Sequence, residues 1–330
     1  MSNKILVIGS NSFSGAQFVS YLLEQGEQVI GVSRSPEPHR AFLPYRWNGK
    51  DGNFTFQQID LNHDLDALDA LMKAEKTNYV VNFAAQSMVG ESWKNPDHWM
   101  MTNVVSTVRL HERLRQLDFL DRYVHITTPE VYGSTEGFIT EDTPFNPSTP
   151  YAVSRAAGDM SLRSYFDAYG FPVVYTRAAN VYGPGQQLYR IIPRTILYIM
   201  MGRKLQLHGG GHSRRSFIHM QDVSDATWRI ATQGRLGQAY HISTNHIVAI
   251  REVVEMICDR LGKSFSDCVE VVGDRLGKDA AYLLDSTRLR TELGWTDSVS
   301  LDDGLNQCIA WVRDNFEALQ SLPPDYIHKP

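Results

Sequence analysis

Short apolar runs alternate with amphipathic segments along the first half of the chain. The apolar runs predict β-strands over residues 4–9, 28–33, 54–60, 79–85 and 122–128. Apolar residues at helical spacing predict helices over 14–25, 66–75 and about 98–117, and another that begins near Tyr151. A helix between successive strands provides the crossover that parallel pairing requires. The pattern therefore predicts an α/β fold with a Rossmann-type, doubly wound parallel sheet.

The pattern becomes less regular in the second half. It predicts a strand within 171–183, a strand and helix over 214–230 that return to the sheet, a short strand at 238–244, and helices over 250–262 and 301–319. We expect a dinucleotide-binding domain over 1–178, to which 214–244 return. Residues 179–213 and 245–330 would then form a smaller, mainly C-terminal lobe that binds the substrate.

Composition excludes several classes of protein. The 330 residues are 42% apolar and 21% charged, which is ordinary for a globular protein, and the net charge of −5 offers no basic face for nucleic acid. No apolar run could span a bilayer, and the first strand begins too early for a signal peptide, so we expect a cytoplasmic protein. The 3 cysteines have no C-x-x-C spacing, and no metal site is predicted.

A glycine-containing turn follows the first strand. In "GSNSFSG" (9–15), Gly9 allows a tight exit from the strand, Gly15 lets the helix approach the sheet, and Ser12 occupies the middle position. Backbone N–H groups around Phe13 and Ser14 would then face a diphosphate at the helix N-terminus. Such a turn can be purely structural, but its place at the first strand–helix junction favours dinucleotide binding.

The second predicted strand ends in Ser33 and Arg34, where NAD-binding proteins usually carry an acidic residue. A hydroxyl and a guanidinium suit a 2′-phosphate, which predicts NADP, with NAD as the alternative. The alternative interpretation of Arg34 is an exposed loop residue. Asp60, followed by Leu61, ends the third strand and would meet the adenine edge, unless it is a plain loop aspartate.

Six segments together resemble the extended short-chain dehydrogenase/reductase family, and within it the nucleotide-sugar 4,6-dehydratases. They are "NFAAQSMVGESWKNP" (82–96), "TTPEVYG" (127–133), "PYAVSRAAGD" (150–159), "ANVYGPGQQLYRIIP" (179–193), "GGGHSRRSFIHMQD" (209–222) and "DRLGKD" (274–279). The first is similar to GDP-mannose 4,6-dehydratase and the last three to dTDP-glucose 4,6-dehydratase. The likeness covers nearly the whole chain.

The resemblance implies a reaction through a 4-keto sugar, with three catalytic residues. Tyr151 would take the proton of the sugar's C4 hydroxyl, and Thr128 would hydrogen-bond the same oxygen. Glu130 would remove the C5 proton and protonate the hydroxyl that leaves from C6. A phenolate is basic enough for an alcohol proton, and a carboxylate can serve as base and acid in turn.

The resemblance also implies binding residues and an assembly. The cofactor would contact Phe83, Ala84, Ala85, Tyr151 and Arg155. The substrate would contact Ser87, Glu130, Asn180, Arg190, Arg215 and Arg275, the arginines being suited to diphosphate. We expect a homodimer joined through the helices that correspond to about 98–117 and 151–169.

The chain departs from the family pattern at two positions. Arg155 replaces the lysine that follows the tyrosine, which keeps the charge but not the compact shape of an ammonium group. Pro129 stands where the dTDP-glucose branch has an acidic residue, and it can donate no proton. Three alternatives stay open: a sugar 4-epimerase, a decarboxylase of the UDP-glucuronate type, and a non-catalytic NADP-binding scaffold whose site has decayed at these two positions.

Overall fold

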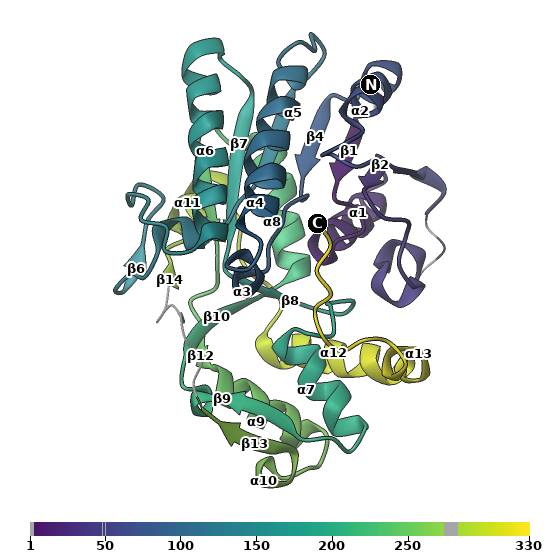
Figure 1. The fold of residues 1–330 in the computed structure, drawn as a ribbon, viewed down its shortest axis with the longest axis vertical. Helices are drawn as coiled ribbons and strands as arrows, with labels where there is room; N and C mark the ends of the chain where they lie inside the picture. The colour runs from purple at the N-terminus through teal and green to yellow at the C-terminus, as the bar shows by residue number, and fades with distance from the viewer. Residues whose placement is uncertain (1–2, 48, 50, 274–282) are drawn as a thin grey trace.

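The centre of the protein is a seven-stranded parallel sheet with the strand order β11-β7-β5-β4-β1-β2-β3. The computed structural model describes residues 3–47, 49, 51–273 and 283–330 (Figure 1). The strands are β1 (Lys4–Ile8), β2 (Gln28–Ser33), β3 (Phe54–Gln58), β4 (Tyr79–Asn82), β5 (Arg122–Ile126), β7 (Val173–Ala178) and β11 (Ala239–Ile242). The predicted Rossmann-type fold class is confirmed.

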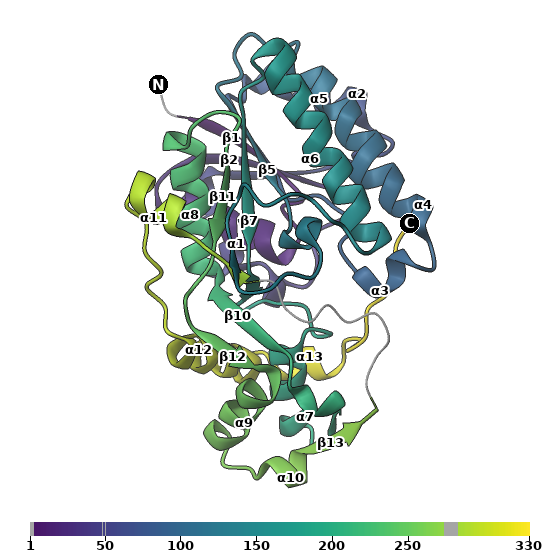
Figure 2. The same ribbon diagram turned by 90° about the vertical axis from the view of Figure 1, so that its left-hand side faces the viewer.

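Helices cover both faces of this sheet (Figure 2). One layer contains α1 (Phe13–Glu24), α8 (Met220–Gln233) and α11 (Thr287–Leu293). The other contains α2 (Leu65–Glu75), α5 (Thr107–Leu114) and α6 (Pro150–Tyr169), with the short α3 (Val89–Ser92) and α4 (Pro96–Met100) beside them. Strands buried on both faces explain why the sequence shows continuous apolar runs instead of alternation.

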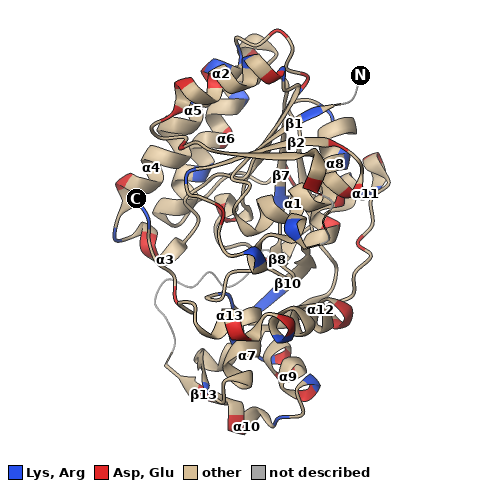
Figure 3. Ribbon diagram, turned by 90° about the vertical axis from the view of Figure 1, so that its right-hand side faces the viewer, with Lys and Arg blue, Asp and Glu red and all other residues tan. Residues whose placement is uncertain are grey.

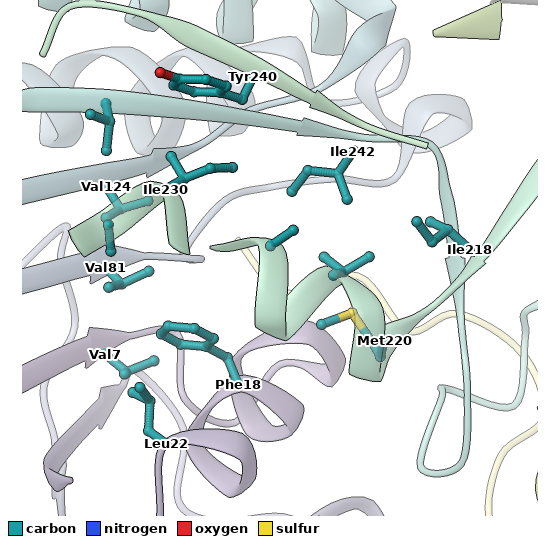
Figure 4. Close-up of a cluster of buried hydrophobic side chains, with 14 of the residues drawn as sticks. Val7, Phe18, Leu22, Val81, Val124, Ile218, Met220, Ile230, Tyr240 and Ile242 are labelled. Atoms are coloured by element: carbon teal, nitrogen blue, oxygen red, sulfur yellow. The ribbon is translucent and has the colours of Figure 1, made fainter. Parts of the chain in front are cut away.

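The first layer packs through a continuous apolar core (Figure 4). Val7, Val81 and Val124 come from three adjacent central strands, and Phe18 of α1 lies against them. All four side chains are fully buried. Complete burial of an aliphatic or aromatic side chain contributes about 1.5–3 kcal/mol, so this layer fixes the helix that follows the glycine-containing turn.

A smaller lobe lies below the carboxyl ends of the strands in Figure 1 and has its own apolar cluster. Its helices are α7 (Ile191–Met200), α9 (Ile250–Arg260), α10 (Phe265–Cys268), α12 (Leu301–Asp314) and α13 (Phe316–Gln320). Its strands are β8 (Asn180–Tyr182), β9 (Leu205–His208), β10 (Arg214–His219), β12 (Ile247–Ala249) and β13 (Val269–Val272). A further pair, β6 (Phe138–Ile139) and β14 (Leu283–Leu284), lies outside both larger sheets.

The sequence pattern assigned one strand to the wrong sheet. We expected residues 214–219 to return to the central sheet, but β10 pairs with β8 and β12 in a separate three-stranded sheet. The strand that reaches the central edge is β11, parallel to β7, after the crossover through α8. Likewise, α11 packs with the main core through Leu289 and Leu293, although it falls in the segment expected to form the smaller lobe. The exact division into two domains stays a prediction.

The helix expected over 98–117 extends over 96–114 and is π-helical in its middle. It consists of α4, a π-helical segment at Met101–Ser106, and α5, which ends at Leu114. The helix expected over 301–319 is divided into α12 and α13. π-helical segments widen one turn and often occur at functional sites.

Basic and acidic positions are mixed along the outer helices in the view of Figure 3. In the part of the chain that the structure describes, no helix is both long enough and apolar enough to cross a membrane.

Candidate active site

The turn between β1 and α1 forms a cradle of backbone at the carboxyl edge of the sheet. Gly9 has a φ of +83°, and a Cβ there would lie 2.7 Å from the backbone nitrogen of Ala84. A Cβ on Gly15 would lie 2.2 Å from the carbonyl oxygen of Gly9, so both positions require glycine. Ser12 caps α1 by accepting a hydrogen bond from the Gly15 N–H at 3.0 Å.

This cradle fits the diphosphate of a dinucleotide. The first N–H groups of a helix, here those of Phe13 and Ser14, have no acceptor within the helix and carry the positive end of its dipole. The Ser10 hydroxyl is buried and has no hydrogen-bond partner among the described residues. These groups could hold a bound diphosphate.

The ends of β2 and β3 flank the crevice where adenosine would lie. The Ser33 hydroxyl accepts a hydrogen bond from the Asn11 N–H at 3.0 Å. The Arg34 guanidinium donates to the carbonyl oxygens of Lys329 (3.1 Å) and Pro330, which lie at the far end of the chain. Asp60 is half-buried, and one of its carboxylate oxygens accepts from the Asn62 N–H at 2.8 Å. Leu61 is buried beside it.

The end of β4 forms the next wall of the crevice. The Phe83 N–H donates to the Ile8 carbonyl at 2.8 Å, which continues the ladder between β1 and β4. Phe83, Ala84 and Ala85 are half-buried, and Ser87 is exposed. The predicted cofactor residues from all four strand ends thus lie along one edge of the sheet, which is where open α/β sheets bind their ligands.

The predicted catalytic residues meet at the end of β5. Thr128 precedes a short 3₁₀ helix, Pro129–Tyr132, and its hydroxyl accepts from the Glu130 N–H at 3.3 Å. Pro129 occupies the first position of that helix, where a missing N–H removes no hydrogen bond. Tyr151 is the second residue of α6, whose start is capped by the Thr149 hydroxyl, which accepts from the Ala152 N–H at 3.1 Å.

Several of these residues influence the pKa of Tyr151. Burial raises the pKa of Tyr151 above its ordinary value. The positive charge of Arg155 opposes that rise, the charge of Glu130 adds to it, and a hydrogen bond with Thr128 and the charge of Arg190 oppose it. The structure therefore brings four predicted site residues within interaction range of the Tyr151 phenol.

Arg155 lies one helical turn beyond Tyr151 and is 4% exposed. Its guanidinium donates to the Ile126 carbonyl at the end of β5. Its Nε is buried and has no hydrogen-bond partner among the described residues. The guanidinium is therefore anchored to the sheet beside the tyrosine and keeps a donor that no residue of the described chain satisfies.

The predicted substrate residues are less closely grouped. Asn180 and Arg215 lie on the neighbouring strands β8 and β10 of the three-stranded sheet. Arg190 is exposed at the start of α7, and its positive charge lowers the pKa of the Tyr151 phenol. Arg275 lies outside the described residues.

Sequence reasoning missed Asn103, which lies in the π-helical segment and is almost fully buried. Its side chain accepts from the Gln86 N–H and donates to the Gln86 carbonyl, both at 2.9 Å. It also donates to the Ser154 hydroxyl at 2.9 Å. Asn103 thus joins the cofactor loop after β4 to the helix that carries Tyr151 and Arg155. The sequence contains no clear signal for it, because Asn103 is one of several polar residues in that segment, with Thr102 and Ser106.

Sequence reasoning also missed a buried polar cluster beneath the catalytic residues. Asp159 of α6 pairs with Arg177 of β7 at 2.8 Å and accepts from the Thr127 hydroxyl at 2.9 Å. Arg177 and the other charged neighbours hold the pKa of Asp159 at about 2, against the effect of its burial. Arg177 also donates to the Tyr132 hydroxyl at 2.9 Å. The cluster therefore links α6, β5 and the short helix that carries Glu130.

The described residues contain no group of three or more His, Cys, Asp or Glu side chains that could hold a metal ion.

Comparison with known proteins places the chain in a family. Residues 6–308 match the family described as GDP-mannose 4,6 dehydratase. The chain belongs to the GDP-mannose 4,6-dehydratase family. Within the extended short-chain dehydrogenase/reductases, this family is the nucleotide-sugar 4,6-dehydratase branch, whose members are hydro-lyases. The predicted resemblance and the predicted enzyme class are confirmed.

Individual relatives cover nearly the full length of the chain. A dTDP-glucose 4,6-dehydratase from Streptomyces niveus is 34% identical over 326 residues, which are 94% of this chain and 93% of the relative. A crystal structure of the dTDP-glucose 4,6-dehydratase from Streptomyces venezuelae, with NAD bound, has a TM-score of 0.88 at 32% identity and covers 96% of this chain and 98% of that one.

A more distant solved structure also has the same fold. The UDP-glucuronic acid 4-epimerase from Bacillus cereus, solved with UDP-glucuronic acid and NAD, has a TM-score of 0.84 at 26% identity and covers 94% of this chain and 99% of that one. Because dehydratase and epimerase have this fold in common, the outcome of the reaction depends on the residues of the site. Their individual roles in this chain stay predictions.

Proposed function

We propose that this protein removes water from a nucleotide-diphosphate hexose and forms a 4-keto-6-deoxy sugar, with a nicotinamide dinucleotide bound permanently at the carboxyl edge of the sheet. The observation that carries the proposal is the meeting of Thr128, Glu130 and Arg155 around the Tyr151 phenol. The relatives whose names specify dTDP-glucose support dTDP-glucose as the first substrate to test.

Each residue has a defined part in this proposal. Tyr151, as a phenolate, takes the proton of the C4 hydroxyl, and the Thr128 hydroxyl orients the same oxygen. The dinucleotide supplies both the oxidant and the reductant, so the cycle consumes no external redox partner. The C4 carbonyl makes the C5 proton acidic, and Glu130 removes that proton. Glu130 then gives it to the C6 hydroxyl, which departs as water. The hydride taken from C4 would return to C6, and C5 would regain a proton, which completes the 4-keto-6-deoxy sugar.

Glu130 carries both proton transfers at C5 and C6 because Pro129 can carry neither. A proline has no titratable side chain, so the neighbour of the glutamate cannot act as a separate acid. A single carboxylate can act as base and then as acid when both sites are on the same face of the substrate. The Pro129 position therefore constrains the mechanism without preventing elimination.

The proposal also concerns which dinucleotide, NAD or NADP, the protein binds. Ser33 and Arg34 led to the prediction of NADP, but in this structure the Arg34 guanidinium donates to the carbonyls of Lys329 and Pro330. The related structures contain NAD. We therefore place NAD before NADP as the cofactor to be tested.

We also propose a homodimer formed through α4–α5 and α6. Apolar side chains are exposed on these adjacent helices: Met101 (44%), Val105 (37%), Val153 (41%) and Met160 (64%). Exposed apolar groups on neighbouring helices are typical of a surface that another subunit covers. The cytoplasmic location also stays a proposal, and it is supported by the three cysteines, which are buried free thiols.

The deciding experiment is mass spectrometry after incubation of the purified protein, with NAD and separately with NADP, with dTDP-, UDP-, GDP- and CDP-sugars. A product lighter by one water is expected. Glu130→Gln and Tyr151→Phe should each abolish its formation, and retained turnover in Glu130→Gln would refute the elimination mechanism.

The second candidate function is 4-epimerisation, which the likeness to the Bacillus cereus epimerase favours. A product of unchanged mass and altered chromatographic retention would establish it, and loss of carbon dioxide from a UDP-glucuronate would indicate decarboxylation. If every sugar is returned unchanged while the dinucleotide binds, the protein is a cofactor-binding scaffold whose site has decayed.

A further inference from the structure

The last eight described residues, 323–330, return from the smaller lobe to the cofactor crevice. In Figure 1 this segment leaves α13 as a yellow trace that rises to the end marked C, which lies beside α4 in Figures 2 and 3. Pro324, Tyr326 and His328 are half-buried while Pro323, Asp325 and Ile327 are exposed, as expected for an extended segment with one face on the protein.

The beginning of this segment is held by the smaller lobe. Arg194 of α7 donates to the Pro324 carbonyl at 3.1 Å and pairs with the Asp325 carboxylate. The Tyr326 ring meets the Tyr189 ring edge to face, with 5.3 Å between their centroids. These contacts direct the chain toward α4.

The middle of the segment is held by α4. The His328 ring stacks on His98 (centroids 5.1 Å apart, rings 13° from parallel) and on Trp99 (5.2 Å and 15°). The His328 Nε2 is 2.8 Å from the His98 Nδ1, so the two rings also have a hydrogen bond between them. Trp99 is fully buried, which provides a rigid surface for the contact.

The end of the segment crosses the carboxyl edge of the sheet. The Lys329 carbonyl accepts from Gln86 Nε2 at 2.7 Å and from Arg34 Nη2 at 3.1 Å. Gln86 follows β4 and Arg34 follows β2, and β1 lies between those strands. Neighbouring strands are about 4.8 Å apart. A chain held at both residues therefore passes in front of the β1–α1 turn, where the diphosphate of the dinucleotide would lie.

Arg34 is the residue that connects this segment to cofactor choice. It is the only side chain predicted to bind a 2′-phosphate by charge, and its Nη1 and Nη2 both donate to backbone carbonyls of Lys329 and Pro330. A planar guanidinium has donors in fixed directions, so a 2′-phosphate would have to draw it away from these carbonyls. A cofactor with a free 2′-hydroxyl makes no such demand.

We propose that residues 323–330 form a strap that retains the bound dinucleotide in its crevice, and that Arg34, as the anchor of this strap, makes the intact protein prefer NAD to NADP. The retention part rests on the proposed function: the cofactor ends each cycle in its starting oxidation state, so it need not leave between turnovers. A strap that slows cofactor release therefore does not slow catalysis.

The test measures cofactor binding in the absence of any sugar. The intact protein is compared with a chain that lacks 323–330 and with the full-length His328→Ala variant, by calorimetry for affinity and by stopped-flow displacement for release. Removal of the strap should speed NAD release at least tenfold and reduce the preference for NAD over NADP at least tenfold. His328→Ala should change both quantities in the same direction by less.

Two further variants separate the roles of strap and anchor. Arg34→Ala in the chain lacking 323–330 should abolish the gain in NADP affinity. Ile327→Ala is the matched control, because this side chain of the same segment is 63% exposed. It should leave both quantities unchanged. Thermal unfolding of each variant, with the cofactor absent, verifies that it is folded.

Unchanged release and preference in the folded shortened chain would overturn the proposal. Tighter NAD binding after removal would overturn it in another way, because the segment would then compete with the cofactor. These outcomes do not depend on the sugar panel. If the strap slows cofactor release but no sugar reacts, the strap proposal is supported and the proposed reaction is wrong.

Discussion

The charge of Arg155 can be tested by its effect on the Tyr151 phenol. Side chains four positions apart on a helix have Cβ atoms about 6 Å apart. With an effective dielectric constant of about 20, two unit charges at that separation interact by about 3 kcal/mol. Since about 1.4 kcal/mol corresponds to a factor of ten, removal of the cation should decrease the phenolate population about 100-fold at a fixed pH below the pKa of Tyr151.

The direction of the change in the pKa of Tyr151 follows from its environment in the folded protein. Burial raises the pKa of Tyr151, and Arg155 lowers it, so Arg155→Met leaves the rise unopposed. The rate of product formation should therefore be about 100-fold lower near neutral pH and should recover as the pH is raised. Arg155→Lys retains the charge and should retain turnover.

The assay is the pH dependence of kcat/KM, with the product measured by mass spectrometry. Arg163→Met provides a control on the same helix, because Arg163 is exposed and pairs with Asp167 at 3.0 Å, away from the site. A folded, cofactor-binding Arg155→Met protein with the wild-type pH profile would refute the electrostatic role of Arg155. A profile that is lower at every pH would indicate a structural role instead.

Three further predictions concern assembly and stability. Met160→Glu places a charge on the exposed apolar face of α6 and should convert a dimer to a monomer in light scattering; an unchanged mass would contradict the proposed interface. Burial lowers the pKa of His219 to about 4 and that of His241 to about 3, so the unfolded chain binds more protons below pH 6.5. Each histidine should lower the free energy of unfolding by about 2 kcal/mol between pH 7.5 and 5, and urea titrations that give equal values at both pH values would exclude this effect. The buried Asp222 carboxylate accepts three hydrogen bonds from residues 298–299, at 2.7–3.0 Å. Asp222→Ala should lower the free energy of unfolding by about 2–4 kcal/mol at pH 7.5, whereas a loss below about 0.5 kcal/mol would show that water replaces these bonds.

The features that the sequence predicted correctly are local in origin. The β1–α1 turn is predictable because only glycine tolerates the positive φ of Gly9 and the close approach at Gly15. The alternation of strands and helices is predictable because it is repeated several times with clear breaks. The placement of β10 is not, because the six residues of this strand do not specify which sheet it joins. Its partners are fixed by tertiary packing with β8 and β12.

Long-range contacts account for the other omissions. Arg34 meets Lys329 and Pro330 across almost the full length of the chain, so no local pattern could have indicated that its guanidinium was engaged. Asn103 reaches Gln86 and Ser154 because the helix widens into a π turn at that point. No feature of the residues themselves distinguishes that turn from an ordinary helical one.

The polar cluster beneath the site bears on whether Arg155 and Pro129 indicate decay. The turn that carries Glu130 is fixed at both ends: Thr128 caps it, and a Cβ on Gly133 would lie 2.2 Å from the Asn146 carbonyl. Buried charges such as Asp159 stabilise a fold less than apolar residues of the same size would. A chain with no use for the site gains nothing from retaining such a pair beneath it. The ordered turn and the retained pair of Asp159 and Arg177 therefore support an active site in which arginine performs the electrostatic role of lysine, and they argue against a decayed scaffold.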